Sequence, residues 1–180
     1  MKKQVIVSAL VLSILCSFNA VQAQTGFQGF ALNPQAGFFN KDGLVYGGDV
    51  DIAWDKMVYS AGYHVLEEHS IASSDRPLET YEHYSFMLGK NLDRGKIRIQ
   101  YLGGIAPFLK TKRTNEIIEL DDGGNTYATE DIWVVGLSIK AGVKYIPFRF
   151  MSVGVDFIAN FNKETPLYIP TLSVEFGLLK

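Results

Sequence analysis

The feature of this chain that most restricts its fold is an alternation of apolar with small or polar side chains, which recurs in eight stretches. Successive side chains of a β-strand point to opposite sides, so alternation with period two predicts strands whose two faces meet different surroundings. No helical periodicity of useful length accompanies it after the first 23 residues. We therefore expect an all-β protein. The predicted strands span residues 27–40, 44–54, 57–66, 81–92, 96–109, 132–146, 150–161 and 167–179.

The two faces of the predicted strands differ sharply. One face is wholly apolar and includes Leu137 and Val155. The other face is rich in glycine and carries the polar residues, among them Ser138. Its charged members, which we expect to form one internal network, are Asp49, Asp51, Arg98, Lys140, Lys144, Asp156 and Glu175.

Two architectures place eight alternating antiparallel strands around an interior, and they need opposite polarities. A soluble ligand-binding barrel buries its apolar face and shows its polar face to water. A membrane barrel turns its apolar face to lipid and fills its lumen with polar side chains. Glycine favours the second architecture, because a narrow lumen needs small residues beside large charged ones. We expect an eight-stranded antiparallel up-and-down transmembrane β-barrel.

The first residues are typical of a secretory signal. Two lysines precede an apolar run over residues 5–18, and small residues at Val21 and Ala23 suit cleavage after Ala23. We thus expect a signal peptide at 1–23 and one barrel domain at 24–180. The single cysteine, Cys16, lies within the predicted signal, so disulfides are not expected. A formal net charge of −2 gives no excess positive field for nucleic acid.

The predicted connections alternate in length. They are short at 55–56, 93–95 and 147–149, whereas 67–80 and 110–131 are long. Membrane barrels have short periplasmic turns and longer outer loops. This pattern predicts that both termini lie in the periplasm.

With this leader, eight alternating strands and alternating connections, the sequence resembles the small eight-stranded bacterial outer-membrane barrels of the OmpA/OmpX type, over its whole length after the signal. Its style is similar to that of small barrels from the Bacteroidota. The resemblance implies an outer-membrane protein without a cofactor. Because eight strands leave only enough space for side chains, we expect a filled polar lumen and a structural or interaction protein that acts through its outer loops, or an accessory subunit of an outer-membrane assembly. Its partners would be outer-membrane lipid, lipopolysaccharide and proteins of that assembly.

Two other functions stay open. His83 and Ser85 form a His-x-Ser triplet, and lipid A deacylases that resemble this size class use such a pair; a buried lumen histidine is the simpler interpretation, because the alternation points both side chains inward. A narrow channel for very small solutes is the other alternative, although eight strands enclose only enough space for side chains.

Two short-range arrangements can also be predicted. His64 and His83 lie opposite each other if 67–80 closes a symmetric hairpin, and two imidazoles with Glu68, His69 or Glu82 could bind a metal; histidines without metal are the simpler interpretation. Symmetric pairing about Phe148 places Lys140 opposite Asp156, which predicts a salt bridge inside the barrel.

Overall fold

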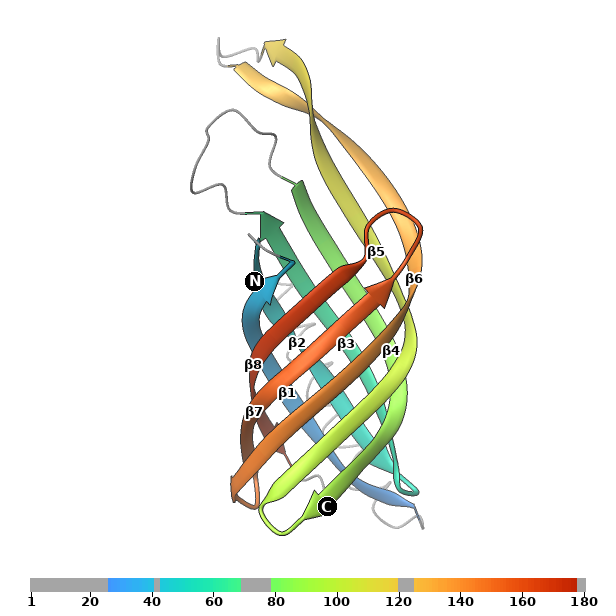
Figure 1. Cartoon of the computed structure of the whole chain (residues 1–180), viewed down its shortest axis with the longest axis vertical. Coiled ribbons are helices and arrows are strands. Elements are labelled where there is room, and N and C mark those ends of the chain that lie inside the picture. Colours follow the sequence, from blue (N-terminus) through green and yellow to red (C-terminus); the bar gives the residue numbers. More distant parts are fainter. Residues whose placement is uncertain (1–25, 41–42, 69–78, 120–124, 178–180) are drawn as a thin grey trace, which may run out of the picture.

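The protein is a closed antiparallel barrel in which β1 to β8 pair in sequence order and β8 pairs with β1 (Figure 1). The computed structural model describes residues 26–40, 43–68, 79–119 and 125–177. Within these ranges no helix is long and apolar enough to cross a membrane. The strands are β1 (Phe27–Phe39), β2 (Gly43–Trp54), β3 (Met57–Glu68), β4 (Glu79–Arg94), β5 (Ile97–Glu119), β6 (Asn125–Phe148), β7 (Met151–Phe161) and β8 (Leu167–Gly177).

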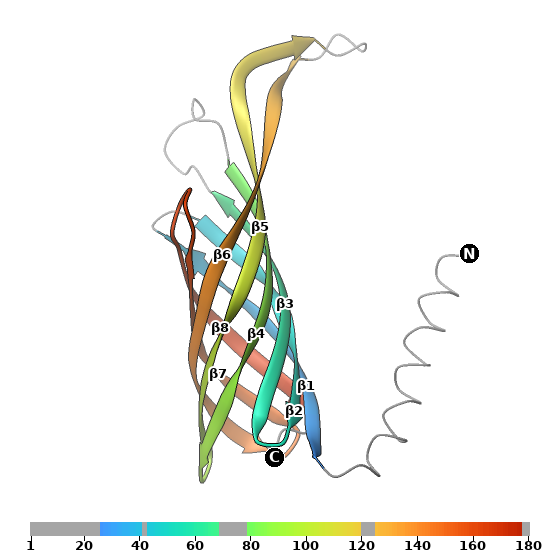
Figure 2. The same cartoon turned by 90° about the vertical axis from the view of Figure 1, so that its right-hand side faces the viewer.

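The predicted all-β fold is confirmed, and six of the eight strands begin and end within two residues of their predicted limits. The prediction of a long loop at 110–131 is wrong. There β5 continues to Glu119 and β6 begins at Asn125, and the two strands pair with each other beyond the rest of the barrel (Figures 1 and 2). We call residues 113–119 and 125–129 the β5–β6 ribbon. Alternation could not reveal it, because a ribbon outside the barrel has no buried face.

Side-chain exposure confirms the predicted polarity of the wall. On the apolar face, Leu137 is 66% exposed, Val155 54% and Leu172 70%. The charged residues of the other face, such as Lys140 and Asp156, are buried inside. This arrangement rules out the soluble barrel, which needs the reverse, and gives the chain the fold of a transmembrane barrel.

The lumen changes in character along its length. Polar side chains occupy the middle, whereas the end next to the β5–β6 ribbon is filled by an apolar cluster. This cluster comes from seven strands, and Val134 of β6 packs against it. Its aromatic members include Phe39, Tyr81 and Phe108, whose rings follow one another at centroid distances of 5.6 and 6.1 Å. The cluster consists of Phe39, Val45, Leu66, Tyr81, Phe108, Ile158, Leu167 and Ile169.

Some predictions concern residues that the structure does not describe. The predicted signal peptide at 1–23 lies outside the described residues, and so do His69 and most of the predicted loop at 67–80. The signal peptide therefore stays a prediction.

Candidate functional site in the barrel lumen

Opposite charges alternate along a chain of ion pairs through the lumen. At the end with the short turns, Arg98 of β5 bridges Asp93 (2.8 Å from Nε to Oδ1) and Glu175 (2.7 Å from Nη1 to Oε1). Glu175 of β8 in turn lies 2.8 Å from Nζ of Lys144. Because each charge has a partner of the other sign, the low-dielectric interior can hold them.

The chain of ion pairs continues toward the ribbon end of the barrel. Lys144 and Lys140 both approach Oδ2 of Asp156, at 3.7 and 3.5 Å. Lys140 also forms an ion pair with Asp49 of β2, across the lumen from β6. Beyond it, Nε2 of His64 lies 3.9 Å from Asp49 Oδ1. With His64 of β3 included, these contacts link every strand from β2 to β8.

Amide side chains fill the space around these charges. The oxygen of Asn33 accepts from Lys144 Nζ at 3.0 Å and from Lys140 Nζ at 3.2 Å when its amide is oriented to match its neighbours. Gln35 donates to Asp49, and its oxygen accepts from Thr171 Oγ1 at 3.1 Å. Gln100 donates to Asp51 at 3.2 Å. Asp51, the remaining member of the predicted network, is thus buried beside an amide.

Glycines leave the room that the charged groups occupy. A Cβ added to Gly142 would lie 1.9 Å from Oδ1 of Asp156, its partner in the β6–β7 ladder. A Cβ on Gly62 would lie 2.1 Å from Oδ1 of Asp49 and 2.6 Å from Oγ of Ser85. These separations are far below van der Waals contact. Gly62 and Gly142 therefore make space for the carboxylates of Asp49 and Asp156, as the sequence suggested for glycines of the inner face.

The predicted register of β6 and β7 is wrong by two residues. Lys140 lies opposite Ile158, and Gly142 lies opposite Asp156. The expected turn at 147–149 is also wrong, because β6 extends to Phe148, which pairs with Met151. The turn is formed by Arg149 and Phe150 and is not centred on Phe148, which moves every partner by three residues. The irregularity between Tyr145 and Phe148 moves the pairing back by one, so the net error is two residues.

His83 and Ser85, the candidate catalytic residues, both point into the lumen. Each side chain is fully buried. Among the described residues, the two ring nitrogens of His83 and the hydroxyl oxygen of Ser85 have no hydrogen-bond partner. A lipid outside the barrel would contact neither of them, so the geometry does not suit attack on an acyl chain in the membrane.

The predicted juxtaposition of His64 and His83 is present. The two residues are partners in the β3–β4 ladder, with ring centroids 6.0 Å apart and planes inclined by 50°. Glu82, another proposed ligand, accepts a hydrogen bond from the Tyr84 hydroxyl at 2.8 Å, whereas His83 between them is buried in the lumen. In the part of the chain that the structure describes, no three His, Cys, Asp or Glu side chains gather as metal ligands.

Two parts of the lumen were not predicted from the sequence. Asp93 was assigned to a turn, yet its carboxylate extends the ion-pair chain to the barrel rim. The apolar cluster at the ribbon end was also missed, although its members share the inward phase of the alternation. Large apolar residues at the loop-side ends of the inner face were the signal that could have revealed it.

Comparison with known proteins identifies the fold. No protein-family model matches the sequence, and no curated protein matches it. The barrel domain of Pseudomonas aeruginosa OprF is 15% identical, with a TM-score of 0.52 over 86% of this chain and all of OprF's solved domain. Neisserial surface protein A is 10% identical, with a TM-score of 0.58 over 87% of this chain and 100% of that one. Ail of Yersinia pestis is 10% identical, with a TM-score of 0.57 over 86% of this chain and 100% of the Ail chain.

At these identities the likeness concerns the fold. It lends no support to an origin in the Bacteroidota. The closed barrel, the apolar outer face and the polar lumen of this chain agree with the fold of these solved barrels. The chain therefore has the fold of the small eight-stranded outer-membrane β-barrels of the OmpA/OmpX type.

Proposed function

We propose that this protein is a closed outer-membrane barrel that acts as an interaction protein on the cell surface through its β5–β6 ribbon. The observation that carries the proposal is the projection of this ribbon well beyond the rim (Figure 2). Its last pairs, such as Glu119 with Asn125, have no neighbouring strand from β4 or β7 among the described residues. A paired extension of the wall holds a surface in place better than a flexible loop does.

The filled lumen supports an interaction role over transport. Ion pairs and amides occupy its middle, and the apolar cluster with Phe39, Tyr81 and Phe108 occupies its ribbon end. Moving a hydrated solute through would require separating buried charge pairs, which costs several kcal/mol each. We therefore rank a narrow channel below an interaction role.

The position of His83 and Ser85 supports a protein without enzymatic activity on lipid. Both residues belong to the polar interior, where Gly62 makes room for the Ser85 hydroxyl beside the Asp49 carboxylate. They serve in this proposal as packing and polar filling of the lumen. The lipid A-modifying alternative predicts that Ser85→Ala changes the acylation of lipid A, which mass spectrometry of extracted lipid A measures.

The proposal can be tested by site-specific photo-crosslinking in living cells. A photoreactive amino acid would replace Thr129 in the ribbon, Val155 on the lipid face or Lys96 in the short β4–β5 turn. We expect a discrete protein or polysaccharide adduct at Thr129 alone. Ail has been solved with the heparin analogue sucrose octasulfate, so sulfated polysaccharides belong among the ligands offered to intact cells.

The pattern of adducts separates the alternatives. A protein adduct at Val155 would instead favour an accessory subunit that meets its assembly inside the membrane. An adduct only at Lys96 would contradict the surface role. Replacing residues 113–129 by a short turn should abolish the Thr129-dependent interaction while the barrel still folds, as heat-dependent migration in SDS gels shows.

A further inference from the structure

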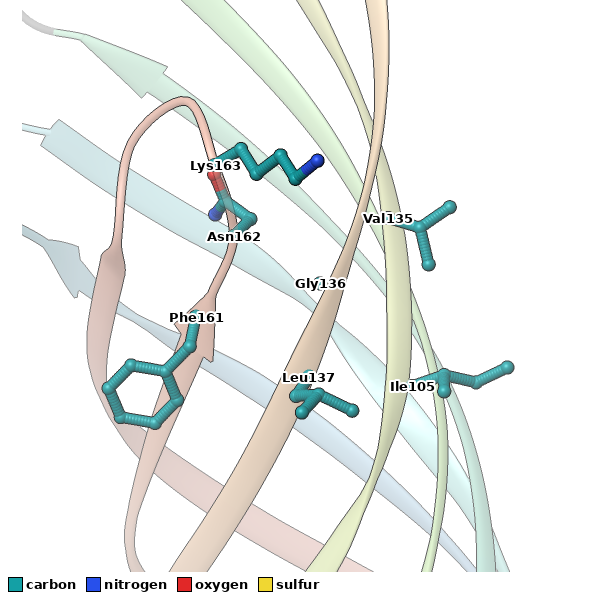
Figure 3. Close-up of a pocket in the computed structure, with 7 residues that line it drawn as sticks. All are labelled: Ile105, Val135, Gly136, Leu137, Phe161, Asn162 and Lys163. Carbon is teal, nitrogen blue, oxygen red and sulfur yellow. The ribbon is translucent and has the colours of Figure 1, made fainter.

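An apolar groove lies on the outer wall where β6 separates from β7 (Figure 3). Phe161, the last residue of β7, pairs with Leu137, and beyond this pair β6 has no β7 partner in the described chain. The resulting groove has a volume of about 460 Å³. Its walls come from β5, β6, the end of β7 and the connection after β7, and consist of Ile105, Val135, Gly136, Leu137, Phe161, Asn162 and Lys163.

The floor of the groove suits hydrocarbon. Ile105, Val135, Leu137 and Phe161 all present apolar side chains on the outer face, and each is about half exposed or more. Asn160 fills the inner side of Gly136, because a Cβ there would lie 2.0 Å from its Oδ1. The groove is therefore open to the membrane and closed to the lumen.

The upper edge of the groove is cationic. Lys163 is exposed, extends toward β6 in Figure 3 and forms no ion pair with any described residue. Its backbone position is fixed by Asn162, whose Oδ1 accepts from the amides of Glu164 and Thr165 at 2.9 and 2.8 Å. Asn162 Nδ2 also donates to the Thr165 carbonyl at 2.6 Å. The ammonium group is thus attached to an ordered turn.

Aromatic residues indicate the depth of this edge in the membrane. Trp133 lies two residues beyond Val135 on the same face of β6, is 64% exposed and stacks on Tyr84 with a centroid distance of 6.2 Å. Trp and Tyr gather at the level of the lipid headgroups. Lys163 lies beyond the last ladder pair, Leu137 with Phe161, and lines the groove together with Val135, two residues from Trp133 (Figure 3). The cation therefore lies at headgroup depth with acyl-chain surface below it.

We propose that this groove is a binding site for one phosphorylated glycolipid of the outer leaflet, lipid A, with a phosphate on Lys163 and an acyl chain along Ile105, Leu137 and Phe161. Lysine binds phosphate as a point charge. The apolar floor of the groove packs against one acyl chain and holds it apart from the surrounding mobile lipid. The proposal rests on the proposed function only in placing the ribbon end of the barrel at the outer leaflet.

The test is lipid retention measured by native mass spectrometry of the detergent-solubilised full chain. Hexa-acylated lipid A and phosphatidylglycerol would be titrated separately onto the wild type and onto the Lys163→Gln, Lys163→Arg and Lys96→Gln variants. Lys96 is also exposed and lies in the short turn before β5, at the other end of the barrel, so it controls for total charge. We expect one tightly retained lipid A, weakened about fivefold by Lys163→Gln, since one interfacial lysine contributes about 1 kcal/mol. Lys163→Arg and Lys96→Gln should bind as the wild type does.

Equal retention by wild type and Lys163→Gln would overturn the site, and so would an equal loss in Lys96→Gln. Retention of phosphatidylglycerol as strong as that of lipid A would overturn the choice of lipid. Heat-dependent gel migration shows for each variant that the barrel is folded. Failure of the surface role is recognised separately, by the absence of adducts at Thr129, and does not alter the lipid titration in detergent.

Discussion

The ammonium group of Lys140 lies 3.5 Å from the carboxylate of Asp156, although the two residues are not opposite each other in the β6–β7 ladder. Lys140 pairs with Ile158, and Asp156 is the diagonal neighbour on the same inner face. Diagonal neighbours are within reach of long side chains. The same ammonium group is closer to Asp49 of β2, so Lys140 joins opposite sides of the barrel.

Removing the Lys140 charge should destabilise the barrel chiefly through Asp49. Lys140→Met leaves two carboxylates short of a partner and should lower the unfolding free energy by about 3 to 5 kcal/mol. Asp156 keeps Lys144 at 3.7 Å, whereas among the described residues Asp49 keeps only His64, at 3.9 Å, as a basic side chain within ion-pair distance. Adding Asp49→Asn should therefore restore more stability to Lys140→Met than adding Asp156→Asn does. Urea unfolding in lipid vesicles measures both double variants, and equal restoration would contradict the unequal partnership.

Gly62 should tolerate no larger residue. Gly62→Ala places a methyl group against the Asp49 carboxylate and the Ser85 hydroxyl, and such overpacking typically costs about 1 to 3 kcal/mol. Gly103→Ala is the matched control, because a Cβ there would meet only the Ser138 carbonyl oxygen at 3.9 Å. Thermal or urea unfolding of the two variants compares them. A Gly62→Ala barrel as stable as Gly103→Ala would mean that the lumen can rearrange around the carboxylate.

A charge on the outer wall should be costly in proportion to its depth in the membrane. Val155→Arg, paired with Val143 in the wall, should lower the unfolding free energy by about 2 to 4 kcal/mol if it lies near the bilayer midplane. Phe148→Arg, at the short turn and 56% exposed, should cost only about 0 to 1 kcal/mol. Refolding titrations into vesicles give both values. An equal loss of unfolding free energy in the two variants would place Val155 and Phe148 at the same depth, and would contradict a wall in which the short turn lies at the membrane edge.

The ribbon end of the barrel should face the outside of the cell. The only cysteine, Cys16, lies in the predicted signal peptide, so a cysteine introduced elsewhere can be labelled selectively. Thr129→Cys should react with a membrane-impermeant maleimide in intact cells, and Lys96→Cys should react only after the outer membrane is opened. Labelling of Lys96→Cys in sealed cells would reverse the topology and place both termini outside.

The purified protein should form no steady pore. The apolar cluster that includes Tyr81 and Phe108, together with the ion pairs of Lys140 and Lys144, fills the lumen, and neither set opens without losing buried contacts. Planar-bilayer recordings should therefore show no stable open level. A steady conductance in the nanosiemens range would favour the channel over the interaction role.

Prediction from the sequence succeeded where one face of a strand differs from the other. The alternation around Leu137 and Ser138 identifies a strand, its outer face and its inner face, because lipid and lumen select opposite residue types at neighbouring positions. It failed in the β5–β6 ribbon, where both faces lie outside the barrel. The ribbon is formed by pairing between β5 and β6 that continues past Lys112 and Glu130. Such pairing between two strands cannot be recognised from the alternation within either strand alone.

By itself, the sequence determined the number of strands, their order and which side chains enter the lumen. The tertiary structure alone decided which of these side chains meet. The irregularity between Tyr145 and Phe148 shifts the register that a symmetric turn implies, and closure of the barrel brings Asp49 against Lys140 from strands far apart in the chain. Periodicity along one strand carries no information about distances across a lumen. Those distances follow from the tilt and stagger of all eight strands together.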